Sequence, residues 1–460
     1  MTPTKLCLGL TLGLASAILG SSTARAQATV KFPDRSFDIR DYGAKMVAAK
    51  FLYDTVPIQK AIDACAAAGG GTVVIPKGNW LTGPLFLRSN VRLEVQRGAE
   101  LAATTEEALF RKTPATAAWT ANEYVATINI ADAENVAVVG EGRIDGQGAV
   151  WWEKWRATTR TTGVRPGANR PRLVYIARSH NVLFEGVSFY NSPSYHLVFK
   201  DCANITVDHV KITALAHSPN TDAIDPIDTR DMVITNNTID CGDDVVALKS
   251  SHVDPNHPGA AVGNITIANN TIIKGRGISI GSETIGGVHH VLVENNTTYD
   301  AMYGIRIKTP RKRGGDVSDI VFRNNKMIGV ETPMVFSTYY ETMPVDEAEV
   351  SRRLAAGGFV LNDQIYPSDR DPAQPFVEHE TPDVHDVIVD GLTATGAVRV
   401  GLIAGLPERP IRGLVLKNVN IQAAEPLRIR HAEVRGEGVK LQASKGPPVT
   451  LESGAKTSGL

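Results

Sequence analysis

Four short polar stretches contain the residues of this chain whose chemistry points to catalysis. In chain order they are Asn220-Thr221-Asp222, Gly242-Asp243-Asp244, Gly275-Arg276-Gly277 and Arg306-Ile307-Lys308. Aspartates can donate a proton or activate water, and neighbouring cations bind an anion. The four stretches fall in four different strand-like repeats, one in each. If the four share a face of stacked β coils, they form one patch about 15 Å long, the length of a few sugar rings.

The spacing within the stretches predicts which side chains point the same way. Arg306 and Lys308 lie two residues apart, so on a strand they project from one side. Asp243 and Asp244 are adjacent, and both reach one site only if the chain bends, which Gly242 permits. A solvated acidic turn is the alternative for this pair alone. With a third aspartate one repeat earlier and the cations two repeats later, a functional cluster is favoured.

The elements that must position these residues are expected to be short β-strands in repeated coils. An Asn or Asp followed by alternating apolar residues recurs at Asn135, Asn181, Asn204, Asp231, Asn264, Asp319 and Asp386, with His290 as a variant. A doubled asparagine follows four of the apolar runs, at Asn236-Asn237, Asn269-Asn270, Asn295-Asn296 and Asn324-Asn325, spaced 33, 26 and 29 residues apart. Asparagine tolerates the left-handed backbone of a corner, and identical side chains at successive corners can form a ladder. The pattern predicts an all-β solenoid, because propeller blades of about 40–50 residues are too long for these repeats.

Two segments are predicted to differ from the coils. Residues 54–68 form the one helix that the pattern predicts, with Ile58, Ile62 and Cys65 on one face. We expect this helix to cover the open end of the solenoid. Residues 338–381 break the repeat with prolines, charges and aromatics, and are expected to be an inserted loop that walls a binding site.

The beginning of the chain indicates export. Residues 1–26 combine a lysine, an apolar stretch from Leu6 to Leu19 and the small residues of Ala24-Arg25-Ala26, a pattern typical of a cleaved secretory signal. Residues 27–460 are then expected to be one solenoid catalytic domain. No later segment approaches the roughly 20 apolar residues of a membrane span, so we expect a periplasmic or secreted protein that does not bind membranes.

Composition excludes some partners. The chain has 460 residues, with 48 Lys and Arg against 49 Asp and Glu, so it has no broad basic field for nucleic acid. We expect it to act as a monomer. Of its cysteines, Cys65, Cys202 and Cys241 follow residue 26; burial as small apolar side chains is favoured, with one disulfide as the alternative. Their spacing predicts no metal site.

Several further motifs resemble those of a known enzyme family. They are Asp41-Tyr42-Gly43-Ala44, Leu81-Thr82-Gly83-Pro84, Ile144-Asp145-Gly146-Gln147-Gly148, Asn191-Ser192-Pro193 and Ile280-Gly281-Ser282-Glu283-Thr284. With the four polar stretches in the same order, they identify the chain as a member of glycoside hydrolase family 28, the polygalacturonases and related pectin hydrolases, most similar to bacterial exo-acting members. The resemblance covers nearly all of the chain after residue 26. It implies a single-stranded, right-handed parallel β-helix.

The resemblance also implies an activity and roles for the polar residues. The reaction is hydrolysis of α-1,4-linked galacturonate bonds in pectin with inversion, without a cofactor or a metal. Asp243 is implied as the general acid, and Asp222 and Asp244 as the pair that activates water. The residues implied to bind the substrate carboxylate are Arg306 and Lys308. Further substrate-contacting candidates are Asn220, Arg276 and Tyr340, and for the last of these ordinary loop packing is the alternative.

Two positions depart from the family pattern. Arg276 stands where a histidine is usual, and Ala223 stands where a glycine usually follows Asn-Thr-Asp. A guanidinium stays charged and would favour the ionised form of a neighbouring Asp243. We therefore expect Arg276 to point away from Asp243 and to bind a second substrate carboxylate. The alternative is contact with Asp243 and a more acidic pH optimum.

Some aromatic residues near these stretches have an ambiguous role. His217 is a candidate substitute for the missing imidazole, with a structural role as the alternative. The tryptophans that could stack on sugars are instead expected to lie in a structural turn; they are Trp151, Trp152 and Trp155.

Three other functions compete with this one. The first is hydrolysis of rhamnogalacturonan or another uronate polysaccharide by the same residues. The second is a calcium-dependent pectate lyase, in which Asp222, Asp243 and Asp244 would hold Ca²⁺ and a basic residue would abstract a proton. The third is a pectin-binding β-helix without catalysis, which the presence of all three aspartates argues against.

Overall fold

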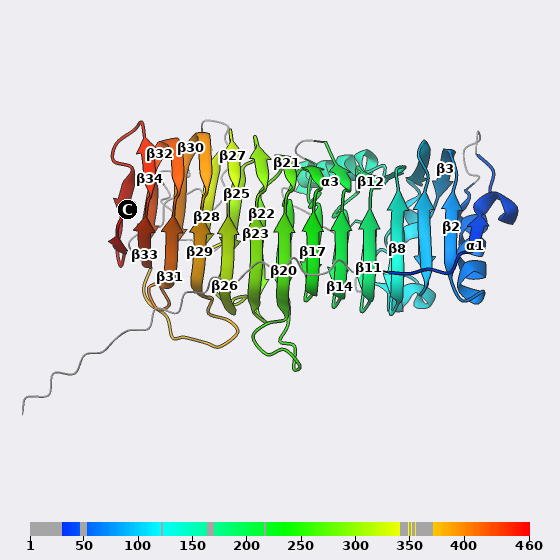
Figure 1. The fold of residues 1–460 in the computed structure, drawn as a ribbon, viewed down its shortest axis with the longest axis horizontal. Helices are drawn as coiled ribbons and strands as arrows, with labels where there is room; N and C mark the ends of the chain where they lie inside the picture. Colours follow the sequence, from blue (N-terminus) through cyan, green and yellow to red (C-terminus); the bar gives the residue numbers. More distant parts are fainter. Residues whose placement is uncertain are drawn as a thin grey trace, which may run out of the picture.

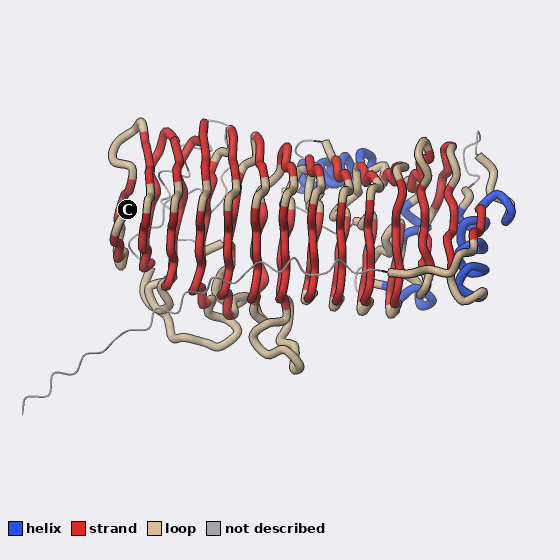
Figure 2. Tube along the Cα trace, viewed as in Figure 1, coloured by secondary structure: helices blue, strands red, loops and turns tan. Residues whose placement is uncertain are grey.

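Parallel strands stacked along one long axis make up most of the chain. The computed structural model describes residues 30–46, 53–120, 123–162, 170–215, 218–340 and 371–460, with the single residues 348, 351 and 355. Figures 1 and 2 show the strands lying side by side, from α1 at one end to the C-terminus at the other. Most coils add one strand to each of three parallel ladders. The predicted all-β solenoid is confirmed, and its form is a right-handed parallel β-helix.

The first ladder is a regular sheet of 14 strands within the described residues. In spatial order its strands are β1 (Ser36–Asp38), β2 (Gly71–Ile75), β5 (Val91–Val95), β8 (Glu134–Gly140), β11 (His180–Glu185), β14 (Ala203–Asp208), β17 (Arg230–Thr235), β20 (Val262–Ala268), β23 (Val288–Glu294), β26 (Asp316–Arg323), β29 (Asp383–Asp390), β31 (Ile411–Lys417), β33 (Ala432–Glu437) and β36 (Lys456–Ser458).

The second ladder consists of strands of three to five residues, except for the long strands β30 and β32. They are β3 (Gly78–Thr82), β6 (Ala99–Ala103), β9 (Arg143–Asp145), β12 (Ser188–Tyr190), β15 (Lys211–Thr213), β18 (Thr238–Asp240), β21 (Thr271–Lys274), β24 (Thr297–Tyr299), β27 (Lys326–Ile328), β30 (Thr393–Ala404), β32 (Asn420–Arg430) and β34 (Lys440–Ala443).

The third ladder follows the polar stretches along the chain. It contains β4 (Leu85–Leu87), β7 (Ile128–Ala131), β10 (Val174–Ala177), β13 (Leu197–Lys200), β16 (Ile224–Ile227), β19 (Val246–Ser250), β22 (Ile278–Thr284), β25 (Tyr303–Lys308), β28 (Thr332–Ser337) and β35 (Val449–Leu451). It joins the second ladder through the long strands β30 and β32, each of which spans both.

The core lies inside the coils and is built by strand alternation. On the first ladder, Val182 pairs with Val136 and Ile205, and the same column continues through Met232 and Ile265. All five side chains are buried. Because every second residue of a strand faces inward, each coil places an aliphatic side chain above the one in the previous coil. The buried apolar cluster formed in this way extends along the β-helix.

Both predictions for the doubled asparagines, a left-handed corner and a ladder of side chains, are confirmed. The first asparagine of each doubled pair has a left-handed backbone, as Asn236 and Asn269 show with φ of 58° each. The second asparagines are buried and form the ladder: Asn237 Nδ2 donates to Asn270 Oδ1 at 2.9 Å, and Asn270 Nδ2 donates to Asn296 Oδ1 at 2.9 Å. Asn296 Nδ2 continues it to Asn325 Oδ1 at 3.0 Å.

The residues that open each repeat also sit in left-handed corners. Positive φ angles between 51° and 58° occur at every position of the recurring motif, namely Asn135, Asn181, Asn204, Asp231, Asn264, His290, Asp319 and Asp386. Asn, Asp and His are the non-glycine residues most enriched in this region of backbone space. The repeat in the sequence therefore marks a repeated local conformation.

Two helices flank the coils. The predicted helix at 54–68 is α1 (Thr55–Ala67), which packs Ile58, Ile62 and Cys65 against the first coils and lies at the end of the molecule (Figure 1). The expected structural turn around the tryptophans is instead part of α3 (Ala149–Thr162). No glycine or proline interrupts this segment, so a helix can form there. The remaining helical segments are α2 (Glu107–Phe110), η1 (Ile39–Tyr42) and η2 (Pro114–Trp119).

The three cysteines after residue 26 are free and buried, as favoured from the sequence. Burial raises the pKa of the Cys65 thiol to about 11 and that of Cys202 to about 12, so both stay protonated. The predicted signal at residues 1–26 and most of the expected insertion at 338–381 lie outside the described residues. Within the described part of the chain, no helix is long and apolar enough to cross a membrane.

Candidate active site

The register of the third ladder aligns the polar stretches on one outward surface, here called the polar face. Near the start of each strand of the third ladder, one core-facing residue pairs with its counterpart in the next coil. The residues two positions before these form the first outward column, in the order Arg172, Tyr195, Asp222, Asp244, Arg276 and Tyr303. The next outward position forms the second column, in the order Tyr175, Val198, Asp225, Ala247, Ser279 and Arg306. Strand alternation thus places side chains that are far apart in sequence about 4.8 Å apart per coil.

Three aspartates meet at the centre of the polar face. One carboxylate oxygen from each of Asp222, Asp243 and Asp244 lies within 4.8 Å of the other two. Asp222 and Asp244 are buried, whereas the side chain of Asp243 is 13% exposed. The predicted convergence of the first two polar stretches is confirmed, and Asp243 is the carboxyl most open to a substrate.

Gly242 permits this arrangement, for a reason different from the one expected. Its φ is outside the left-handed region, so backbone freedom is not what the position requires. A Cβ at this position would lie 2.5 Å from the Ser218 carbonyl oxygen and 2.7 Å from Thr221 Oγ1. Real Cβ atoms essentially never approach so closely. The glycine is therefore needed because the corner before Asp243 packs directly against the preceding coil.

The two predicted cations lie against Asp244. Lys308 Nζ bonds one carboxylate oxygen of Asp244, and Arg306 Nη1 lies 3.9 Å from the other. Ser279 Oγ donates to Asp244 Oδ1 at 3.0 Å. All of these side chains are buried. The arrangement holds Asp244 in one orientation and keeps it charged.

Burial, repulsion and these cations give the three carboxyls different protonation properties. Burial, with repulsion from neighbouring carboxylates, raises the pKa of Asp222 well above its usual value. Burial also raises the pKa of Asp243, against the opposing effect of a nearby guanidinium. Burial alone would do the same to Asp244, but Lys308 and the other cations outweigh it and hold the pKa of Asp244 below its usual value. The cluster can therefore hold a proton while Asp244 remains ionised.

A buried ion pair that sequence reasoning missed supports Asp222. Lys249 Nζ bonds Asp225 and lies 3.6 Å from Asp222 Oδ2. It also lies 4.8 Å from the centre of the Tyr195 ring. Asp225 and Asp222 hold the pKa of Lys249 well above its usual value, although burial opposes this. A lysine that ends the otherwise apolar run Val245–Leu248 was the available signal, since such a charge is seldom buried without a partner.

The expectation that Arg276 points away from Asp243 is wrong. Arg276 Nη1 lies 3.3 Å from Asp243 Oδ1, and the guanidinium is about one-third exposed. Arg276 and Asp243 come from adjacent coils. The backbone N–H of Arg276 donates to the backbone carbonyl of Asp243 at 2.8 Å, which holds the two residues side by side. Arg276 also lines a pocket of about 360 Å³, together with Gly242 and Met302.

Tyr340 and Asn220 lie at opposite ends of the aspartate cluster. The Tyr340 ring centre is 5.3 Å from the Arg306 guanidinium and 5.2 Å from Lys308 Nζ, so the structure brings Tyr340 to the predicted cations. Asn220 has a left-handed backbone with φ of 51°, and its side-chain oxygen accepts from Arg170 Nη2 at 3.2 Å. That bond fixes the corner from which Asp222 follows.

Several other sequence candidates are placed by the structure. Ala223 is fully buried in the core, so the methyl group in place of the usual glycine hydrogen fills apolar space. His217 lies outside the described residues. Trp151 and Trp152 are buried on α3, and Trp152 Nε1 donates to the Ser192 carbonyl at 3.1 Å. These two rings are part of the packing.

A buried histidine outside the four stretches holds the backbone of Asp222. His196 Nδ1 donates to the Asp222 carbonyl at 3.1 Å, and its Nε2 accepts from the Ser192 N–H at 3.4 Å. Burial lowers the pKa of His196 to about 4, so the ring is neutral. It follows the Asn191-Ser192-Pro193 motif, which was noted in the sequence without this role.

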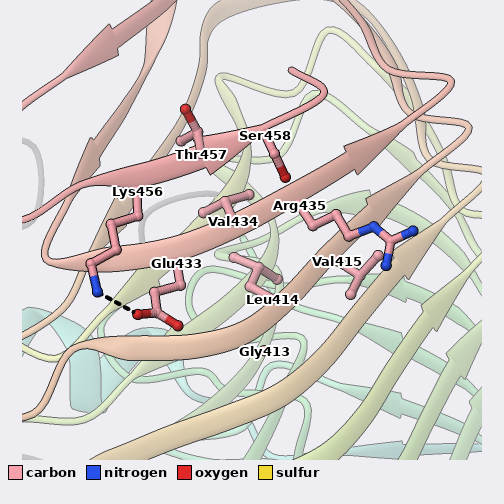
Figure 3. Close-up of a pocket in the computed structure, with 9 residues that line it drawn as sticks. All are labelled: Gly413, Leu414, Val415, Glu433, Val434, Arg435, Lys456, Thr457 and Ser458. Atoms are coloured by element: carbon pink, nitrogen blue, oxygen red, sulfur yellow. Dashed lines mark hydrogen bonds and ion pairs between the residues drawn. The ribbon is translucent and has the colours of Figure 1, made fainter. Parts of the chain in front are cut away.

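A second groove lies far from the aspartates. It has a volume of about 460 Å³ and is lined by β31, β33 and β36 at the C-terminal end (Figure 3). Its charged side chains include Glu433 and Lys456, which pair with each other at 2.8 Å. Exposed ion pairs of this kind contribute little to stability. Among the residues that line the groove, Glu433 is the single carboxylate, so the groove has no pair of carboxyls for acid–base catalysis.

The three aspartates also have the spacing of metal ligands. The same cluster, however, has Lys308 bonded to Asp244 and Lys249 3.6 Å from Asp222. Cations at these positions already neutralise the carboxylates and would repel a calcium ion. The residues present therefore do not fit a calcium site, and the arrangement suits acid–base chemistry.

Comparisons with known proteins agree with this geometry. Residues 65–351 match the family model described as glycosyl hydrolases family 28. An endo-polygalacturonase of Pectobacterium carotovorum subsp. carotovorum is 32% identical over 352 residues, covering 73% of this chain and 83% of that protein. A polygalacturonase of Ralstonia nicotianae is 30% identical over 406 residues, covering 72% of this chain and 74% of that protein.

Solved structures show the same fold. The polygalacturonase from Erwinia carotovora ssp. carotovora superposes with a TM-score of 0.64 at 27% identity, covering 92% of this chain and 97% of that one. An exopolygalacturonase from Thermotoga maritima gives a TM-score of 0.71 at 24% identity, covering 90% and 93%. The matching family model, the extent of these relatives and the aspartate cluster lead to one conclusion: the chain belongs to glycoside hydrolase family 28.

Proposed function

We propose that this protein is an exported hydrolase of α-1,4-linked galacturonate bonds in pectin. In this proposal Asp243 protonates the leaving glycosidic oxygen, and Asp222 and Asp244 hold and activate the attacking water. Arg306 and Lys308 bind the carboxylate of the substrate. Export rests on the signal-like pattern of residues 1–26.

The observation that carries the proposal is the meeting of three carboxyls in unequal environments beside a cation pair. General acid catalysis needs a carboxyl that holds its proton to higher pH than a free aspartate does, and burial shifts the pKa of Asp243 in that direction. Water activation needs a charged carboxylate, which Asp244 provides with its lowered pKa. The pKa of Asp222 is raised more strongly, but Asp243 is the more exposed of the two, and geometry favours it as the donor to a substrate.

Asp222 is suited to holding the water. Its Oδ1 is buried and accepts no hydrogen bond from any described residue, while Oδ2 faces Lys249. A buried acceptor of this kind gains from a water that donates to it. Asp222 and Asp244 occupy the same outward column one coil apart, so a water can bridge them.

Inversion is the part of the proposal that rests on the resemblance of the motifs. The closest carboxylate oxygens lie within 4.8 Å, nearer than the roughly 6.5–9.5 Å between carboxyl groups in most inverting glycosidases. Proton NMR of the first products decides this point. The inverted anomer is expected, and the retained anomer would refute the proposed displacement by water.

The catalytic roles are tested by Asp243→Asn and Asp222→Asn. Each substitution is expected to lower kcat on polygalacturonate by at least roughly 10²- to 10⁴-fold, the contribution of one proton-transfer group. Glu433→Gln is a suitable control, because it removes a carboxylate from the distant C-terminal groove. Near wild-type activity in either aspartate variant would remove the mechanism. The size of products over time on polygalacturonate and on rhamnogalacturonan distinguishes endo from exo action and identifies the preferred polymer.

The role of the cation pair is tested with esterified substrate. Arg306→Ala and Lys308→Ala are expected to reduce kcat/KM on free-acid polygalacturonate far more than on its methyl ester, because only the ionised carboxylate binds the cations strongly. Equal losses on both substrates would show that the pair acts by holding Asp244. Chelation without loss of activity and without unsaturated products would agree with hydrolysis; calcium-dependent formation of unsaturated products would instead establish a lyase.

A further inference from the structure

One cation of the polar face, Arg172, lies outside the aspartate cluster. Arg172 begins the first outward column, one coil before Tyr195 and two coils before Asp222. Its backbone position is fixed on one side by the Thr127 N–H, which donates to the Arg172 carbonyl at 3.1 Å. On the other side, the Leu173 N–H donates to the Tyr195 carbonyl at 3.1 Å. Arg172 is therefore held on the same surface as the aspartates.

Two tyrosine rings position the Arg172 side chain. Its guanidinium carbon lies 5.3 Å from the centre of the Tyr175 ring and 5.4 Å from that of Tyr195. Such contacts orient a guanidinium through its planar face and leave its N–H edge available for hydrogen bonds. Lys249 Nζ also lies 4.8 Å from the centre of the Tyr195 ring and 3.6 Å from Asp222 Oδ2, which connects this position to Asp222.

No described residue forms an ion pair with Arg172. Among the described residues, its side chain also forms no hydrogen bond, and its Nε is buried without a partner. Asp225 is close enough to be affected by its charge but is bonded to Lys249. A partly buried guanidinium whose donors lack acceptors is costly unless a ligand supplies them.

The position along the axis identifies the ligand. Two coils separate Arg172 from Asp222, about 10 Å along the β-helix axis at the usual strand spacing, which is the span of two pyranose rings. Arg306 and Lys308 lie beyond the aspartates in the opposite direction along the axis. A polymer with a carboxylate on every sugar can therefore meet cations on both sides of the cleaved bond.

We propose that Arg172, held by Tyr175 and Tyr195, binds the carboxylate of a second uronate about two sugar rings from the bond that the aspartates cleave. This inference rests on the proposed function, because it takes the uronate polymer as the substrate. The planar guanidinium pairs with the carboxylate, and the half-buried Tyr195 ring supplies apolar area for the sugar. The site would make the enzyme prefer oligomers long enough to reach it.

The test compares oligogalacturonates of two to five residues. Arg172→Gln is expected to reduce kcat/KM by roughly 10- to 100-fold on the longer oligomers, the effect of losing a charge-assisted hydrogen bond, with little change on the dimer. The loss should nearly disappear on methyl-esterified oligomers. Arg172→Lys keeps the charge and is expected to restore part of the preference for the free acid.

The matched control is Arg178→Gln, from the same coil, which removes an arginine paired with Asp132 at 2.6 Å. If Arg172→Gln behaves like this control at every chain length, the proposal is refuted. An equal loss on dimers, long oligomers and esters would assign Arg172 a purely structural role and would also refute it.

A binding measurement separates this inference from the proposed function. Calorimetric titration with trigalacturonate is done on Asp243→Asn and on the same variant carrying Arg172→Gln, so that cleavage does not interfere. A roughly tenfold weaker Kd in the double variant is expected from the lost ion pair. Equal affinities would overturn the inference even if the wild type hydrolyses the polymer. Failure of the wild type to hydrolyse any uronate would refute the proposed function, whatever the titration shows.

Discussion

Replacing Lys249 with methionine is expected to destabilise the protein in a pH-dependent way. Lys249, whose side chain is 13% exposed, is the cation shared by the buried Asp222 and Asp225. Burial already raises the pKa of both carboxyls, and Lys249 opposes that rise. Methionine retains the length and apolar stem of lysine but leaves the two buried carboxyls without their cation.

The magnitude follows from the burial of the pair. Removing one partner of a buried ion pair costs about 3–5 kcal/mol. Unfolding entropy is about 2.1 cal/mol/K per residue, so for roughly 430 residues each kcal/mol lowers Tm by about 1 °C. Lys249→Met is therefore expected to lower Tm by about 3–5 °C at pH 7.

The sign of the pH dependence follows from the raised pKa values. In the variant, both carboxyls have a folded-state pKa further above the unfolded value of about 3.9. Such groups cost nothing when they are protonated in both states and destabilise the fold increasingly as pH rises above the unfolded value. The difference in Tm between wild type and variant should grow between pH 4 and pH 7. Thermal melts at one fixed scan rate, followed by circular dichroism, measure it.

The control is Lys326→Met, an exposed lysine on β27 whose loss should leave Tm nearly unchanged at every pH. Adding Asp225→Asn to Lys249→Met should recover part of the lost Tm, because it removes one of the two stranded charges. A deficit independent of pH, or one no larger than that of the control, would show that Lys249 does not neutralise these carboxyls.

Three further predictions concern the site and its support. Arg276→Gln is expected to move the basic limb of the pH–rate profile to higher pH, because the guanidinium 3.3 Å from Asp243 lowers the pKa of the proposed acid. Gly242→Ala is expected to reduce kcat roughly 10²-fold by displacing the corner that carries Asp243. Asn270→Ala orphans two buried donors of Asn237, and should cost about 1–3 kcal/mol for each, measured as a fall in Tm.

Each of these has its own control. Gly83→Ala places a Cβ no nearer than 3.3 Å to its neighbours and should be mild, so similar effects at Gly83 and Gly242 would contradict the packing argument. Thr271→Ala changes an exposed neighbour of the asparagine ladder and should lower Tm less than Asn270→Ala; an equal fall would show that the ladder bonds do not stabilise the protein. An unchanged pH profile in Arg276→Gln would show that the guanidinium does not influence the acid.

Local conformation was the part of the fold that the sequence revealed most reliably. The corner residues were predictable because left-handed backbone is a property of single residues, and Asn, Asp and His tolerate it better than most. The helix α1 was predictable from its apolar face and its glycine stop. By contrast, α3 was missed, because its tryptophans were interpreted as part of a turn and not as one side of a helix.

The catalytic candidates were also visible in the sequence, since their types and order are local features of four short motifs. The residues that surround these candidates in space were not visible in the sequence. Lys249, Tyr195 and Arg172 lie in segments that read as ordinary strands, and their roles depend on which residues stand above and below them in neighbouring coils.

The sequence alone therefore determined the kind of coil and the chemistry available at its corners. The tertiary structure decided which charges meet. The reason is that neighbours in a β-helix are one coil apart in space but a variable number of residues apart in sequence, because the loops between coils differ in length. The register between β19 and β22 shifts after Leu248, so even the pairing of neighbouring strands does not follow from residue numbers alone. The contact of Arg276 with Asp243, opposite to our expectation, was set by this register and by the packing at Gly242.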